Sequence, residues 1–197
     1  MPPFVRTLLM RHEPVRDVAE HAKSALGAVL GILAIGALAY VTALPLLLAP
    51  LGATAVILFG YPGGALAQPV NVFGGYLLAT VVGVVTALVF PGQWWMAAPA
   101  VGLTLFGMQT LRITHPPAGA VPVLALQMPG DSATLFVTLL VACLGMLLLA
   151  VIVHRLPPCR TYPAPHPGLP VQTPVTDGSD KPKSWLAGES GRCCIDG

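Results

Sequence analysis

The stretch from Ser24 to Leu111 contains no Asp, Glu, Lys or Arg. It is far longer than the roughly 20 apolar residues that one transmembrane helix needs, so it must contain several membrane crossings. Over the whole chain, 55% of the residues are hydrophobic and 9% are charged, which is typical of an integral membrane protein. We therefore expect an all-α membrane protein rather than a soluble domain, with the lipid bilayer as its main partner.

Proline and glycine clusters divide the apolar sequence into four long and two short segments. The long segments are predicted full spans at residues 24–44, 72–90, 96–111 and 134–153. The short segments, 51–59 and 121–128, reach about half the hydrocarbon thickness at ~1.5 Å per residue. Gly27 and Gly31 form a GxxxG pattern, which permits close helix packing in lipid. The predicted fold is a helical bundle of four full spans plus two short broken or re-entrant helices.

Polarity divides the chain into three regions. Residues 1–23 are too long and too mixed in charge for a cleavable signal peptide, so we expect a retained cytoplasmic leader. Residues 24–154 form the predicted transmembrane domain, with halves at about 24–90 and 93–153. Residues 155–197 are rich in proline and are expected to be a disordered tail, since they cannot bury enough apolar surface. Basic residues near both ends indicate that both termini are cytoplasmic, in a multi-pass protein of a bacterial inner membrane.

The segment from Thr114 to Ala120 places a histidine and two prolines between two long apolar runs. Pro116 and Pro117 lack backbone N–H donors, so one helix should end near Arg112 and another should begin just after the prolines. If this break lies at membrane depth, it must be buried in protein or line a water-filled cavity, because lipid cannot satisfy free backbone groups. The break is therefore a candidate site.

A weak internal repeat surrounds this break. Pro50-Leu51-Gly52-Ala53 and Pro117-Ala118-Gly119-Ala120 share the pattern Pro-x-Gly-Ala, and each lies between two long spans at the start of a short apolar piece. Interrupted helices in matching positions of two halves point to the binding site of a transporter. The pattern can also recur by chance in a chain rich in proline, glycine and alanine.

The repeat leaves two topologies open. Two crossings per half give four spans and two re-entrant segments. Three crossings per half give six spans and an inverted repeat. Arg112 lies outside in the first topology and inside in the second, so the preference of basic residues for the cytoplasm mildly favours six.

The chain resembles the HPP family of small integral membrane proteins, which is named after the motif at His115-Pro116-Pro117. The resemblance covers about Ala22 to Val153 and rests on several motifs together: Pro50-Leu51-Gly52-Ala53, Leu66-Ala67-Gln68-Pro69, Asn71-Val72 with Gly74-Gly75, and Thr114 to Ala120. It implies four transmembrane helices and, through plastid and cyanobacterial members, an association with nitrite transport. Two positions depart from the family pattern: Val70 where a basic residue is frequent, and Tyr76 where a histidine is frequent.

The candidate substrate site follows from the two short helices. Unpaired N–H groups and the positive dipole end make a helix N-terminus attractive to anions, and glycine lets a small ion approach the backbone. Arg112 and His115 would add positive charge, and Gln68 and Asn71 would add neutral donors. The predicted substrate-binding residues are His115, Arg112, Thr114, Gly119, Ala120, Gly52, Ala53, Gln68 and Asn71.

These residues also have simpler explanations. Arg112 can snorkel to the membrane interface from a helix end. His115 can bond a carbonyl freed by the prolines, and Asn71 and Asp131 can cap helices. The expected function is transport of a small inorganic anion, nitrite being the first candidate. The alternative is a non-transporting membrane scaffold or accessory subunit that packs through glycine-rich helix faces, and a third, weaker possibility is a channel for a neutral solute.

No enzyme chemistry is indicated. The spans contain almost no acids or bases from which a catalytic set could be built. We expect no cofactor, no metal and no nucleic-acid partner, because His115 has no other ligand at a useful spacing and the net charge of +2 comes from the tails. Cys193 and Cys194 could bind a metal or be modified, but an idle tail is the preferred interpretation. We also expect assembly into a homo-oligomer, as a dimer or trimer.

Overall fold

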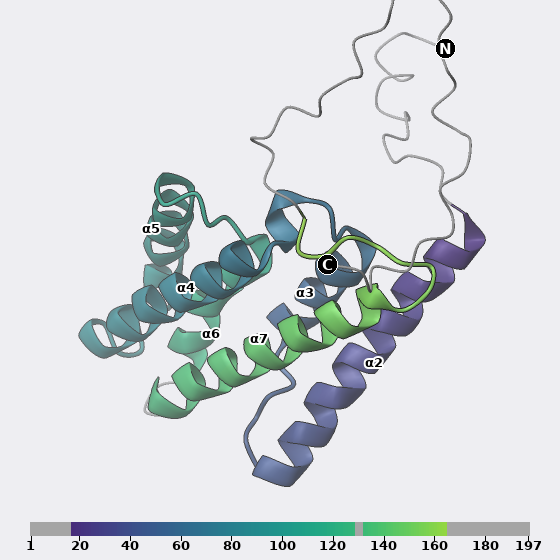
Figure 1. Ribbon diagram of the computed structural model, residues 1–197. Coiled ribbons are helices and arrows are strands. Elements are labelled where there is room, and N and C mark those ends of the chain that lie inside the picture. The colour runs from purple at the N-terminus through teal and green to yellow at the C-terminus, as the bar shows by residue number, and fades with distance from the viewer. Residues whose placement is uncertain (1–16, 129–131, 165–197) are drawn as a thin grey trace, which may run out of the picture.

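A computed structural model describes residues 17–128 and 132–164 of the chain. Within these residues it contains six α-helices, three short 3-10 helices and no strand (Figure 1). The elements are α2 (Val18–Thr42), α3 (Ala49–Gly60), η1 (Ala65–Ala67), α4 (Pro69–Val89), η2 (Trp94–Met96), α5 (Ala97–Thr110), η3 (Pro116–Ala120), α6 (Val121–Gln127) and α7 (Ser132–Arg155). The expected all-α architecture is confirmed for this part of the chain.

Three helices are long and apolar enough to cross a membrane, in the described part of the chain. They are Val18–Thr42, Pro69–Val89 and Ala133–Arg155, and they correspond to three of the four predicted full spans. The fourth predicted segment, 96–111, coincides with α5 to within one residue at each end, but at 14 residues α5 is shorter than the three helices above. It is short because η2 takes Trp94–Met96 into a tighter turn, and Arg112 adopts a left-handed φ of 57° just after the helix ends. In place of the four full spans that were expected, the described residues contain three long helices and the shorter α5.

Helix α3 begins partway along the length of α2 rather than beyond its end. After α2 ends, Ala43 takes a left-handed φ of 54° and the chain turns back on itself. Leu47 of the returning segment lies within 3.6 Å of the place where a side chain on Gly36 would begin. The extended segment 43–48 therefore runs back along the last turns of α2 to the start of α3 at Ala49. Pro50 lies in the first turn of α3, a position that suits proline.

The glycines of α2 let it pack closely against two other helices. A Cβ atom on Gly27 would lie 2.6 Å from the Phe59 ring and 3.2 Å from Val153, and one on Gly31 would lie 3.0 Å from the sulfur of Met146. Phe59 belongs to α3, and the other two residues belong to α7. Since Gly27 meets a later residue of α7 than Gly31 does, α2 and α7 are antiparallel, and the GxxxG pattern serves packing.

Helix α4 is the centre of the second half. A Cβ on Gly83 would lie 2.9 Å from the backbone of Pro122, and one on Gly75 would lie 2.8 Å from the Cβ of His115. The order of these contacts shows that η3 and α6 run parallel to α4. On α5, a Cβ on Gly107 would approach Leu78 to 2.9 Å. Helix α4 therefore carries α5 on one side and the broken helix η3–α6 beside it.

Corresponding helices of the two halves have corresponding neighbours. Helix α3 packs between α2 and α7, and α6 packs between α5 and α4. The first long helix of each half also packs on the last helix of the other, α2 on α7 and α5 on α4. Burial agrees at the two Pro-x-Gly-Ala motifs: in each, the proline and the next residue are buried, the glycine is half-buried and the alanine is exposed. The two short helices therefore occupy similar environments.

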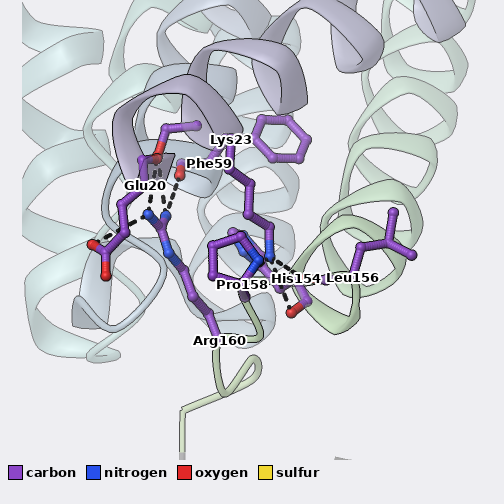
Figure 2. A network of polar contacts seen from close by, with 8 residues as sticks. Glu20, Lys23, Phe59, His154, Leu156, Pro158 and Arg160 are labelled. Carbon is purple, nitrogen blue, oxygen red and sulfur yellow. Dashed lines mark hydrogen bonds and ion pairs between the residues drawn. The ribbon is translucent and has the colours of Figure 1, made fainter. Parts of the chain in front are cut away.

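A segment after α7, which we call the C-terminal strap (residues 156–164), folds back over one end of the bundle. Arg160 donates to the carbonyl oxygens of Phe59 and Glu20, each at 3.1 Å (Figure 2). It also donates to Ser24 Oγ at 3.0 Å. Lys23 Nζ donates to the carbonyl oxygen of Pro158 at 2.6 Å. We call this end, where α2 begins and α3 and α7 end, the strap end.

The strap occupies the first part of the predicted tail. The rest of that tail, residues 165–197 with Cys193 and Cys194, lies outside the described residues, as do residues 1–16 of the predicted leader and Asp131. Tyr162 anchors the strap by donating its hydroxyl to the carbonyl oxygen of Ala67 at 2.9 Å. Burial, with a smaller contribution from Cys143, raises the pKa of Tyr162 above its usual range, so the hydroxyl keeps its proton and remains a donor.

Candidate functional site

His115 is completely buried where the two broken helices meet. It is the residue before η3, with an extended backbone (φ −137°, ψ 98°) that the following Pro116 favours. Tyr76, on α4, lies seven residues from the start of its helix, about 10 Å from the strap end of α4. Since His115 packs beside Tyr76 with a ring-centroid distance of 5.5 Å, it lies well inside the bundle.

Both ring nitrogens of His115 have partners. Nδ1 lies 2.8 Å from the carbonyl oxygen of Leu66, so Nδ1 carries a proton and donates it. Nε2 lies 2.9 Å from Thr54 Oγ1, and Thr54 Oγ1 lies 2.7 Å from the Tyr76 hydroxyl. The three side chains come from three different elements, α3, α4 and the η3 break. We call Thr54, Tyr76 and His115 the junction cluster.

Glycine and a single amide allow the η3 break to lie close to α4. Gly75 has no side chain where His115 approaches, since its Cβ would be only 2.8 Å from that of His115. Asn71 Nδ2 donates to the carbonyl oxygen of Thr114 at 3.2 Å. Asn71 is thus not the cap of α4, because Pro69 already begins the helix. The Asn71 amide satisfies a carbonyl that the break leaves without a helical partner.

Arg112 and His115 are in different environments. Arg112 is exposed and has a left-handed backbone, whereas His115 is fully buried. The structure therefore does not place them together as two positive charges in one site. His115 bonds a carbonyl, as the simpler interpretation expects, but the carbonyl is that of Leu66 and not one freed by the prolines.

The two Pro-x-Gly-Ala motifs present open backbone. Apart from the glycine's own chain neighbours and nearby helix backbone, no atom lies within 4 Å of the place where a Cβ on Gly52 or on Gly119 would be. Both glycines are half-buried, and the neighbouring Ala53 and Ala120 are exposed. The first motif forms the opening turn of α3, and the second forms η3. A small ligand could therefore reach the main chain at both positions.

Gln68 serves the strap instead of the junction cluster. Its side-chain nitrogen donates to the carbonyl oxygens of Pro62 and Gly64 at 2.9 and 3.0 Å, and its oxygen accepts the N–H of Ala164 at 2.8 Å. These three bonds hold the turn between α3 and α4 against the strap. Gln68 therefore has a structural role at the strap and does not contact the junction cluster.

Sequence reasoning missed two members of the junction cluster. Thr54 is the only polar side chain of α3, and it follows Pro50 by one helical turn. Tyr76 was noted only as a departure from the family pattern. The hydroxyl groups of Thr54 and Tyr76 could have identified them, because a hydroxyl in an apolar membrane helix needs a hydrogen-bond partner.

Sequence reasoning also missed a second buried histidine. His154, near the end of α7, is 1% exposed and its Nε2 donates to the carbonyl oxygen of Leu58 at 2.8 Å. Its Nδ1 is buried without a hydrogen-bond partner. Among residues 17–128 and 132–164, no group of three or more His, Cys, Asp or Glu residues could hold a metal ion.

Comparisons with known proteins give the family. The model of the HPP transmembrane region family matches residues 13–163. Two proteins of Dictyostelium discoideum described as transmembrane proteins are each 34% identical to the chain, over 165 and 163 residues. The alignments cover 78% and 76% of this chain but only 58% and 52% of those relatives, so the chain spans little more than half their length. No solved structure matches. With a family match over most of its length and, in its described part, three helices suited to crossing a membrane, the chain belongs to the HPP transmembrane family of membrane proteins.

Proposed function

We propose that this protein transports a small inorganic anion across a bacterial inner membrane, with nitrite as the first candidate substrate. The observation that carries the proposal is the meeting of two broken helices inside the bundle, where Thr54 of α3 bonds His115 at the start of η3. Interrupted helices that meet at the boundary between two structural repeats form the binding sites of many transporters.

The arrangement of the helices supports an inverted repeat. Helix α3 starts partway along the bundle and ends at the strap end, whereas η3–α6 runs parallel to α4, away from that end. The two short helices thus begin near one another and run towards opposite ends. With the extended segment 43–48 and the connection 111–115, each half crosses three times, which is the six-crossing alternative. This topology lets one half rock against the other and expose the junction alternately to each side.

The α3 N-terminus supports an anion as substrate. Helix α3 has 12 residues, and its opening turn carries no side-chain cap, so the positive end of its dipole is not already used by a capping side chain. Gly52 lies in that turn and leaves space for a ligand beside the main chain. Gly119 offers the same open main chain in the other half. The proposed binding residues are therefore Gly52, Ala53, Gly119 and Ala120, with Thr114 and His115 behind them.

The backbone before α3 also supports a path for water or ions. In segment 43–48, Pro45 and Leu47 are exposed, and Leu47 is 60% exposed. Irregular backbone at membrane depth occurs where it is buried in protein or lines a water-filled cavity, not where it faces lipid. We propose that this segment lines the substrate path. Arg112, exposed at the other break, would attract anions to the entrance.

The basic residues at the strap end support its cytoplasmic placement. Lys23 and Arg160 bond there, and Arg155 closes α7 at the same end. An excess of Lys and Arg marks the cytoplasmic side of inner-membrane proteins. We propose that the strap end, with both described chain ends, faces the cytoplasm.

Flux measurements with glycine variants test this function. Purified protein in liposomes should give saturable nitrite flux, and Gly52→Leu or Gly119→Leu should lower it by at least about tenfold, which corresponds to 1.4 kcal/mol. Gly102→Leu is the matched control, because Gly102 also has nothing within 4 Å but lies on the exposed side of α5. Flux equal in all three variants would contradict the proposed site. No flux from well-folded protein, together with a stoichiometric partner in pull-downs, would favour the scaffold alternative.

A further inference from the structure

We propose that each transported anion moves together with one proton, and that His115 carries this proton. The inference rests on the proposed function and adds the coupling ion to it. It is carried by the hydrogen bonds of the junction cluster, which can satisfy the imidazole in both of its protonation states without moving a heavy atom.

In the neutral state, each polar hydrogen of the cluster has one acceptor. His115 Nδ1–H donates to the carbonyl oxygen of Leu66 at 2.8 Å. Thr54 donates its hydroxyl hydrogen to the free lone pair of His115 Nε2 at 2.9 Å. Tyr76 in turn donates its hydroxyl hydrogen to Thr54 Oγ1 at 2.7 Å. The neutral imidazole is therefore fully bonded.

The protonated state is also fully bonded. A proton added at Nε2 turns that nitrogen into a donor, and Thr54 Oγ1 accepts its N–H across the same 2.9 Å. Thr54 then turns its own hydrogen to the carbonyl oxygen of Pro50, which lies 3.1 Å away. Tyr76 continues to donate to Thr54, whose two acceptor positions and one donor are then all used. A rotation of one hydroxyl hydrogen thus accommodates the proton.

Of the three side chains in the junction cluster, His115 alone is a base that can take up a proton. Helices α3, α5, α6 and η1 bring no titratable side chain, and α4 brings only Tyr76. Cys143 of α7 is a buried thiol near Tyr76. Arg112, on the same connection as His115, is exposed and lies outside the cluster. The described elements around the junction therefore offer no carboxylate to share the proton.

The charge balance favours this coupling. A single anion in a low-dielectric interior is costly unless a positive charge accompanies it. At the junction the described helices supply only backbone dipoles, since Arg112 lies outside the cluster. A protonated His115 beside the α3 N-terminus makes the loaded state neutral: one negative and one positive charge enter, cross and leave together. By linkage, the two affinities change together. If protonation of His115 raises the affinity for the anion by some factor, the bound anion raises the affinity of His115 for the proton by the same factor.

Proton exchange requires the junction to open. His115 has no exposed surface in the present conformation, so the proton can enter or leave only when the two halves separate. The anion site and the proton site then open on the same side in the same step. Such shared opening is what couples the two flows.

Proteoliposomes test the coupling directly. An outside-to-inside nitrite gradient should acidify the vesicle interior, read by a trapped pH dye, with one proton for each nitrite ion taken up. An imposed potassium diffusion potential should leave the flux unchanged, because the loaded carrier is neutral. Protein-free vesicles give the background, since nitrous acid crosses a bare bilayer. Saturable flux that follows the imposed potential would overturn this inference alone. Absence of saturable flux would overturn the proposed function and this inference with it.

Variants of the cluster separate the proton site from a structural role. His115→Gln should abolish the flux-linked acidification. Thr54→Val should move the pH of half-maximal flux down by roughly one unit, since a charge-assisted hydrogen bond is about twice as strong as the neutral one. Thr54→Ser should restore the wild-type pH profile. Thr104→Val is the matched control, because Thr104 is equally buried but bonds only its own helix. Acidification that survives in a folded His115→Gln protein, or an unchanged profile in Thr54→Val, would overturn the inference.

Discussion

Thr54 is a small residue on which three separate elements depend. Its hydroxyl oxygen contacts Tyr76 of α4, His115 of the η3 break and Pro50 of its own helix. A buried hydroxyl is costly without partners, and here each partner is itself buried and polar. The junction between the two halves is therefore specified by hydrogen bonds between buried polar groups.

The hydroxyl of Tyr76 contributes to the free energy of unfolding through its hydrogen bond to Thr54. Tyr76→Phe removes the donor to Thr54 Oγ1 and leaves a buried acceptor with one partner fewer. We expect a loss of about 1–2 kcal/mol in the free energy of unfolding, measured by denaturant titration in detergent micelles. Tyr40→Phe is the control, because Tyr40 is 91% exposed on α2. Equal stability of the two variants would show that the Tyr76 hydroxyl contributes nothing to the junction.

At the scale of elements, glycines decide how close the broken helices lie to their neighbours. Gly75 and Gly83 lie two turns apart on α4, and each leaves room for the same partner, the run from η3 into α6. Side chains at these positions would push that run away from α4. The position of the second break in the bundle therefore depends on α4 as much as on its own prolines.

The close contact between Gly83 and Pro122 can be tested by the substitution Gly83→Ala, which adds one methyl group. In Gly83→Ala the new Cβ would lie 2.9 Å from the backbone of Pro122, which cannot move as a flexible side chain would. We expect a destabilisation of about 1–3 kcal/mol by thermal or denaturant unfolding in micelles. Gly102→Ala, with open space around it on α5, should be neutral or stabilising by up to about 1 kcal/mol. A stable Gly83→Ala protein would mean that α6 can shift away from α4 at little cost.

At the scale of the whole molecule, the strap joins helix ends that are far apart in the chain. Arg160 bonds the end of α3 and the start of α2, and Tyr162 bonds η1 just before α4 (Figure 2 shows Arg160 and its partners). Cations at helix C-termini also interact favourably with the negative end of the helix dipole, and Arg160 lies in this way at the end of α3. The strap therefore limits the separation of α2, α3 and α4 at this end.

Removal of Arg160 should release the strap without unfolding the bundle. Arg160→Ala eliminates three hydrogen bonds and the 3.6 Å ion pair with Glu20. We expect amide hydrogen exchange in residues 156–164 to accelerate by at least about tenfold, with little change in α4 and α7. Arg155→Ala, at an exposed position at the end of α7, should leave strap exchange unchanged. If Arg160→Ala also left it unchanged, Lys23 and Tyr162 would be sufficient to hold the strap.

Much of this architecture could be predicted from local sequence. The uncharged run from Ser24 to Leu111 requires membrane helices, and the prolines and glycines mark where these helices stop. Three spans and both short helices were expected at nearly their observed positions. These features are local because each depends on the hydropathy or backbone restriction of a few consecutive residues. Helix α5 was also expected at nearly its observed bounds, but its 14 residues are too few for the full span that its hydropathy suggested.

The sequence by itself thus determined a helical membrane protein of the HPP family with breaks at Pro50 and at His115-Pro116-Pro117. Only the tertiary structure decided that Thr54 and Tyr76, separated from each other by 22 residues, and His115, 61 residues from Thr54, form one cluster. It also decided that Arg112 is exposed while His115 is buried. The physical reason is that an apolar segment or a helix break can be recognised from the residues that form it. The partner of a buried polar group, in contrast, depends on which helix faces pack together.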